Sequence, residues 1–181
     1  MITIGFLESN SIARGVEAAD AMLKAAEVKL VVARPSCPGK YHIMISGEVS
    51  AVQSAMDAGK EKVGGSLIDE LVIPRVHPQV IEAINLATMP EKIRAIGVME
   101  YFSVVQAVIG ADAAVKAAGV ELIEVRLGTG IGGKSFVVLT GDVSAVEASV
   151  QAGTKDAIEN GLLISQIVIA HPHPDLVQTL L

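Results

Sequence analysis

The chain has 181 residues, 51% of them hydrophobic, no Trp and a formal net charge of −6, with a pI of about 5.2 and a mean hydropathy of +0.52. Without a basic stripe or aromatic residues for base stacking, nucleic-acid binding is set aside. No apolar run reaches the ~18 residues of a membrane span, and the N-terminus lacks the regions of a signal peptide, so we expect a cytosolic protein whose excess apolar surface is buried against other subunits.

The first part of the chain predicts a strand, a helix and a further strand. The segment "TIGFLE" (3–8) has the alternating character of a short strand. Ser11 or Asn10 caps a helix, and one face of this helix carries Ile12, Val16, Ala19 and Leu23. The β-branched segment "KLVVAR" (29–34) predicts the next strand.

A loop then leads to a strand, a second helix and a last strand. The strand is "YHIMISG" (41–47). Ser50 and Gln53 have capping-box spacing at the start of the helix. The segment "ELVIP" (70–74) is a strand that we expect to end at its proline. The order β-α-β-β-α-β predicts a small α/β (α+β) fold, in which a small antiparallel sheet is flanked by helices.

The second part of the chain repeats the first. The segment 4–30 aligns with 96–122 without a gap, and "GKYHIMISGEVSAVQSAMDAG" (39–59) aligns with "GKSFVVLTGDVSAVEASVQAG" (133–153). The second copy also repeats the capping-box spacing, with Ser144 and Glu147. Two homologous domains, 1–90 and 91–181, are therefore expected, joined by residues 85–95.

The two copies differ most at the tip of the central hairpin, which is 35–39 in the first copy and 127–133 in the second. Repeats that agree in their frame and differ at one loop suggest that this loop carries the specialised function. The second tip fits the phosphate-loop pattern, with Gly128, Gly133, Lys134 and Ser135. That pattern requires a helix after the loop, and "SFVVLTG" reads as a strand. A flexible glycine-rich tip is the simpler interpretation.

The first tip holds Cys37, the single cysteine of the chain, between Pro35 and Pro38. A lone cysteine is often a small buried hydrophobe, but prolines and Gly39 mark exposed turns. A reactive nucleophile, a redox thiol and a metal ligand stay open as interpretations, and His42 is the nearest candidate base. If the tip lies on a threefold axis, three thiolates converge and match three irons of a [4Fe–4S] cluster, whose fourth iron takes a non-protein ligand.

Other candidate residues carry weaker signals. His77, His171 and His173 stand beside prolines, but no thiol or carboxylate nearby completes a metal site. Glu8 and Glu100 occupy twin positions, which favours a structural role. No Ser/His/Asp set and no carboxylate pair within one copy indicates general acid–base catalysis, so we do not expect an enzyme.

Three blocks of each copy resemble the bacterial microcompartment (BMC) shell domain. In the first copy these are "GFLESNSIARGVEAADAMLKAAEVKLV", "SGEVSAVQSAMDAG" and "LVIPRVHP", and the second copy repeats them in the same order. With "CPGK" in the first hairpin tip, the tandem pair is similar to the T-type shell proteins of propanediol-utilisation microcompartments. The resemblance implies two unpermuted BMC domains in each chain.

The resemblance also implies an assembly and a site. Three chains form a homotrimer, a flat pseudohexamer whose hairpin tips face a central pore and which packs with other BMC shell proteins. Cys37 from the three chains would ligate one [4Fe–4S] cluster at the threefold axis. The pore would be lined by Ser36, Pro38, Gly39, Thr129 and Gly130. The tile-edge contacts would be Lys24, Lys116 and Arg75, with His171 at the counterpart of Arg75.

The sequence therefore predicts a structural shell protein that passes electrons between lumen and cytosol or delivers an intact cluster, with a redox enzyme as a partner. A metabolite-pore tile without a cofactor is one alternative. A soluble trimeric sensor or nucleotide-binding protein that uses residues 128–135 is another.

Overall fold

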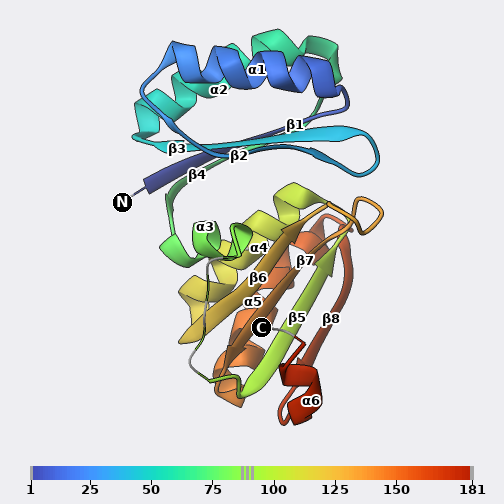
Figure 1. The fold of residues 1–181 in the computed structure, drawn as a ribbon. Helices are drawn as coiled ribbons and strands as arrows, with labels where there is room; N and C mark the ends of the chain where they lie inside the picture. Colours follow the sequence, from blue (N-terminus) through green and yellow to red (C-terminus); the bar gives the residue numbers. More distant parts are fainter. Residues whose placement is uncertain (1, 87, 89, 91, 180–181) are drawn as a thin grey trace. The chain divides into compact units, whose positions relative to one another are not determined.

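The computed structural model describes residues 2–179 except 87, 89 and 91, and it divides into two compact units, residues 1–76 and 77–181. Figure 1 shows that each unit is a two-layer fold of a sheet with two long helices on one face. Among the described residues, no helix is long and apolar enough to cross a membrane.

Unit 1 has the predicted β-α-β-β-α-β order. Its strands are β1 (Ile2–Ser9), β2 (Lys29–Ser36), β3 (Lys40–Gly47) and β4 (Leu67–Val76), and its helices are α1 (Ile12–Ala25), α2 (Val49–Val63) and the short 3₁₀ turn η1 (Gly64–Ser66). The strands are antiparallel in the order β2-β3-β1-β4. Ser11 caps α1 as predicted, because its side chain accepts a hydrogen bond from the Arg14 backbone N–H.

Unit 2 repeats this arrangement. Its strands are β5 (Ala95–Tyr101), β6 (Val120–Leu127), β7 (Ser135–Gly141) and β8 (Leu163–Ile169), in the order β6-β7-β5-β8, and its long helices are α4 (Val104–Ala117) and α5 (Val143–Glu159). A short helix, α6 (Pro174–Val177), follows the last strand. The predicted fold class is therefore confirmed.

Two local predictions were wrong, and one helix was not predicted. The capping boxes at Ser50 and Ser144 are not formed, because α2 begins after Glu48 and α5 begins after Asp142 without a side-chain cap. Strand β4 does not end at Pro74 but continues to Val76, since an edge strand tolerates the missing N–H of proline. The sequence also missed helix α3 (Pro78–Ile84), although a proline at its first position is a known start signal.

Helix α3 belongs to unit 2 by its contacts. The backbone N–H of His77, at its N-cap, donates to Asp112 Oδ1 at 2.8 Å, and the side chain of Gln79 accepts from the backbone N–H of Leu122 at 2.9 Å. The boundary between the compact units therefore falls between Val76 and His77 in the chain. The boundary predicted from the repeat, 90/91, assigned this helix to the first copy.

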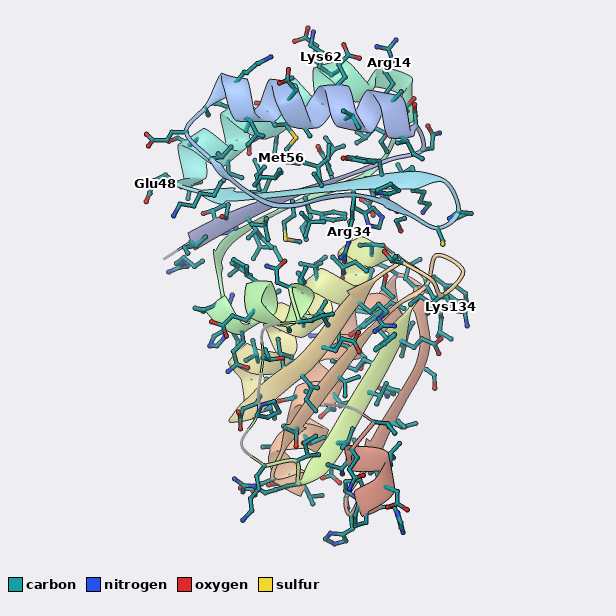
Figure 2. All side chains as sticks on the ribbon, viewed as in Figure 1. Arg14, Arg34, Glu48, Met56, Lys62 and Lys134 are labelled. Carbon is teal, nitrogen blue, oxygen red and sulfur yellow. The ribbon has the colours of Figure 1, made fainter. Side chains whose placement is uncertain are left out.

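Alternation along the strands separates two faces of the unit 1 sheet. One face packs on the helices and forms the core, and Figure 2 shows Met56 in this layer. The residues of this core are Leu7, Ala18, Ala19, Met22, Tyr41, Ile43, Ile45, Val52, Ala55, Met56 and Val63. The buried stripe of α1 is thus Gly15, Ala18, Ala19 and Met22, whereas Ile12, Val16 and Leu23 from the predicted apolar face are exposed.

Each unit has one tyrosine at the same cross-strand position, but the tyrosine lies on opposite strands of the pair in the two units. In unit 1, Ser9 on β1 pairs with Tyr41 on β3; in unit 2, Tyr101 on β5 pairs with Ser135 on β7. The Tyr101 hydroxyl donates to the carbonyl of Gly153 at 3.0 Å, and burial raises the pKa of this phenol. The ring therefore fills the space where α4 approaches α5.

Substitution of Gly110 tests this close approach. A Cβ at Gly110 would lie 2.2 Å from the Tyr101 hydroxyl and 2.7 Å from the Gly153 carbonyl oxygen. We expect Gly110→Ala to lower the free energy of unfolding by about 2–3 kcal/mol through overpacking. Gly119→Ala is the matched control, because nothing lies within 4 Å of its added Cβ. Equal denaturation midpoints for the two variants would contradict the close approach.

Candidate functional site

Cys37 lies at the tip of the β2–β3 hairpin. Ser36 and Lys40 are the last paired residues of the two strands, so the tip is residues 37–39. The cysteine is free and partly exposed. Gly39 has φ +77, in the left-handed region that favours glycine, and nothing lies within 4 Å of an added Cβ. The sequence prediction of a turn with an accessible thiol is consistent with this geometry.

One chain does not complete a metal site at this tip. Among the described residues, no group of three or more His, Cys, Asp or Glu side chains could hold a metal ion. A centre that uses Cys37 as a ligand therefore requires donors from further chains or from outside the protein. The donor chemistry fits this requirement, since thiolates are the ligands of iron–sulfur clusters.

His42 is not placed as a base for Cys37. It lies on β3 opposite Glu8 of β1 and Arg34 of β2. Its Nε2 is 3.0 Å from Glu8 Oε1, and its side chain is fully buried. The sequence considered this histidine as a partner of the thiol, but strand geometry directs its hydrogen bond to the carboxylate.

Glu8 accepts two hydrogen bonds close to the tip of the hairpin. Lys40 Nζ lies 2.9 Å from the same Oε1 atom that faces His42. Burial alone raises the pKa of the Glu8 carboxyl, but the hydrogen bonds from His42 and Lys40 outweigh it, so this pKa lies below its ordinary value. The stability that the ionised carboxylate contributes is therefore present above its unfolded-state pKa and is lost as the pH falls through the lowered value in the folded protein.

A row of ionisable residues crosses the sheet at this level. Arg34, His42, Glu8 and Asp69 stand opposite one another on four neighbouring strands, on the face away from the helices. Figure 2 shows Arg34 on this face. Burial raises the pKa of Asp69, and the negative charges of Glu8 and Glu70 add to the effect. The sequence pattern missed this row, although Glu8 and Lys40 both recur in the second copy.

The hairpin tip of unit 2 is longer and has no thiol. It spans residues 128–134 between the paired Leu127 and Ser135. Four glycines have positive φ, namely Gly128, Gly130, Gly132 and Gly133, and Thr129 donates to the carbonyl of Leu127 at 3.2 Å. Strand β7 follows at once, so the phosphate-loop pattern lacks the helix whose N-terminus would face a phosphate.

The predicted tile-edge residues are on the surface of their units. Lys24 pairs with Asp20 at 2.6 Å, and Lys116 pairs with Asp112 at 2.5 Å, each one turn back along its helix. Arg75 has φ +57, an uncommon conformation for a residue with a side chain. The assignment of these three residues to tile edges, and of Ser36, Pro38, Gly39, Thr129 and Gly130 to a pore, stays a prediction.

Comparisons with known proteins agree with this architecture. The family model described as the BMC domain matches residues 3–76 and 95–172. The chain is 44% identical over 173 residues to the bacterial microcompartment shell protein PduT of Citrobacter freundii, covering 96% of this chain and 94% of that protein. It is 42% identical over 82 residues to the carboxysome shell protein CsoS1B of Halothiobacillus neapolitanus, covering 44% of this chain and 74% of that protein.

A solved structure is similar over almost the whole length. The crystal structure of a microcompartments protein from Desulfitobacterium hafniense DCB superimposes with a TM-score of 0.95, is 53% identical, and covers 98% of this chain and 99% of that chain. The chain therefore belongs to the BMC-domain family. With two tandem BMC domains, it is a structural shell protein of a bacterial microcompartment, as the resemblance predicted.

Proposed function

We propose that the chain forms a homotrimeric shell tile whose threefold axis brings three Cys37 thiolates together on one [4Fe–4S] cluster. The cluster would supply one-electron chemistry in the shell, either for electron transfer across it or for delivery to a redox enzyme. The observation that carries this proposal is the position of the single thiol, on a short hairpin tip in unit 1 and absent from the twin tip in unit 2.

The exposed apolar face of α1 supports an assembly of several chains. Ile12, Val16 and Leu23 are 44%, 52% and 40% exposed. Because exposed apolar patches mark interaction surfaces, this face of α1 suits contact with another copy of the chain.

One sheet face is also left uncovered. On the face of the unit 2 sheet away from its helices, Val98 and Phe136 are only partly buried and Ile167 is exposed. A chain that leaves one helix face and one sheet face uncovered suits a heterologous contact between copies, which closes into a ring with cyclic symmetry.

A ring of three chains supplies three thiols. A trimer carries three copies of Cys37 and no further cysteine. Three thiolates match three irons of a cubane, and the fourth iron is left with a ligand from outside the protein. The proline on each side of the thiol restricts the backbone of the tip, which favours a fixed position for each sulfur.

Anaerobic purification of the wild-type protein tests the proposal. We expect a brown protein with about four irons and four sulfides per trimer, an EPR signal after reduction, and a trimer mass by light scattering. A colourless protein that forms sheets even after cluster reconstitution would leave a metabolite-pore tile without a cofactor. Micromolar nucleotide binding that is lost in Lys134→Ala would instead favour the nucleotide-binding alternative.

A further inference from the structure

We propose that the buried Glu8–Lys40–His42 network positions the Cys37 hairpin for ligation. This inference rests on the proposed cluster, and it assigns a role to residues that do not touch the ligand themselves.

The tip that carries the thiol lies one residue pair beyond the three-stranded part of its sheet. Strand β1 pairs with β3 as far as Ser9 and Tyr41, and β2 and β3 add only the pair Ser36 and Lys40 before the tip. A tie between Lys40 and β1 would therefore act directly beside the tip and restrict how far it can swing.

Lys40 supplies that tie. It is the first residue after the tip in β3, and its ammonium group reaches back to Glu8 of β1 at 2.9 Å. The side chain of Glu8 is 3% exposed and that of Lys40 is 26% exposed, so solvent and salt screen this charged hydrogen bond less than a surface pair.

His42 fixes the carboxylate that Lys40 meets. It contributes a second hydrogen bond to Glu8 Oε1, at 3.0 Å, from a fully buried ring. With Nε2 protonated, the imidazole donates to the carboxylate, which holds the oxygen in place. The ring also packs against Phe6, with centroids 5.4 Å apart, so its own orientation is restricted.

Unit 2 has the same lysine–glutamate pair without the second hydrogen bond. Lys134 pairs with Glu100 at 3.2 Å. Phe136 stands opposite Glu100, where His42 stands opposite Glu8. The reinforced tie therefore accompanies the short hairpin that carries the thiol, and the pair without a second hydrogen bond accompanies the longer tip without a thiol.

A fixed tip matters because three thiolates must reach the irons of one cluster together. Outer partners that orient the ligands of a metal site change its affinity by about 10- to 100-fold when they are removed. We therefore expect loss of the network to accelerate cluster loss by a similar factor, without loss of the trimer.

Four variants test this role. His42→Phe introduces the residue of unit 2 and removes one hydrogen bond, whereas His42→Gln keeps an N–H donor and should rescue. Lys40→Met breaks the tie in unit 1, and Lys134→Met breaks the twin pair beside the tip without a thiol as the matched control. The readouts are the rate of cluster loss to an iron chelator, the EPR line width after reduction, and amide hydrogen exchange of residues 34–42 in the protein without cluster.

We expect His42→Phe and Lys40→Met to lose the cluster at least 10-fold faster, with a broadened EPR signal and faster exchange in 34–42, whereas His42→Gln and Lys134→Met resemble wild type. Unchanged cluster loss and exchange in both His42→Phe and Lys40→Met would overturn the inference. If wild type binds no cluster, the proposed function fails, and hydrogen exchange of the hairpin alone decides whether the network restrains the tip.

Discussion

Cys37→Ser is expected to abolish iron and sulfide binding while the trimer persists. The hydroxyl of serine is a far poorer ligand for iron than a thiolate, and threefold symmetry removes all three sulfur ligands with a single substitution. The tip is partly exposed and outside both cores, so the free energy of unfolding should change by less than about 0.5 kcal/mol. The measurement is iron and sulfide per trimer after anaerobic purification, with EPR and light scattering on the same sample.

The second hairpin tip provides the control for this result. Shortening the glycine-rich segment 129–133 should change the shape of the pore and leave the iron content as in wild type, because Thr129 and the glycines offer no thiolate. Iron that survives Cys37→Ser, or iron that disappears when the second tip is shortened, would show that the two loops have been assigned the wrong roles.

Much of the fold could be predicted because the sequence states it twice. A strand or helix that is ambiguous in one copy is supported by the other, and Ser11 and Ser103 mark the starts of twin helices in both. The tips were also recognisable, since they are where the copies diverge. Helix α3 begins at Pro78, where the last matching block of the first copy ends, and its counterpart α6 begins at the matching Pro174 but is only one turn long, so the repeat gave a helix there little support.

The apolar face of α1 shows where sequence patterns mislead. Ile12, Val16 and Leu23 are large and recur at helical spacing, so they indicate a core-facing stripe. The stripe that packs on the sheet is Gly15, Ala18, Ala19 and Met22, because helices that approach a sheet closely need small side chains. Periodicity reports that a face is apolar, but it does not tell whether the cover comes from the same chain or from another copy.

The polar network under the hairpin was hidden for a different reason. Glu8, Lys40 and His42 lie on two strands that are far apart in the sequence, and only the antiparallel register of β1 and β3 brings them together. The twin glutamates indicated a structural role. The register then shows that His42 stands opposite Glu8 and that Phe136 stands opposite Glu100, so only unit 1 has a histidine beside its glutamate.

Val16→Asp is expected to convert the trimer into monomers. Val16 is the most exposed of the three large apolar residues on the outer face of α1. If this face is covered by another copy, an aspartate there becomes a buried charge without a partner, at a cost of about 3 kcal/mol for each contact. Such a cost weakens each contact by more than about 100-fold. The measurement is the mass by light scattering across a dilution series, together with iron content.

Arg14→Asp separates this effect from a general effect of charge on α1. Figure 2 shows Arg14 on the outer side of the helix layer, and its partner Glu17 is also exposed. An aspartate in the first helical turn is favourable with the helix dipole, so this variant should remain a trimer with wild-type iron.

Because Val16 is exposed in a single chain, Val16→Asp monomers should still fold, with a wild-type circular dichroism spectrum. They should nevertheless be colourless, since one chain supplies one thiolate. A Val16→Asp protein that stays trimeric would instead require the uncovered face of α1 to point away from the contact between chains.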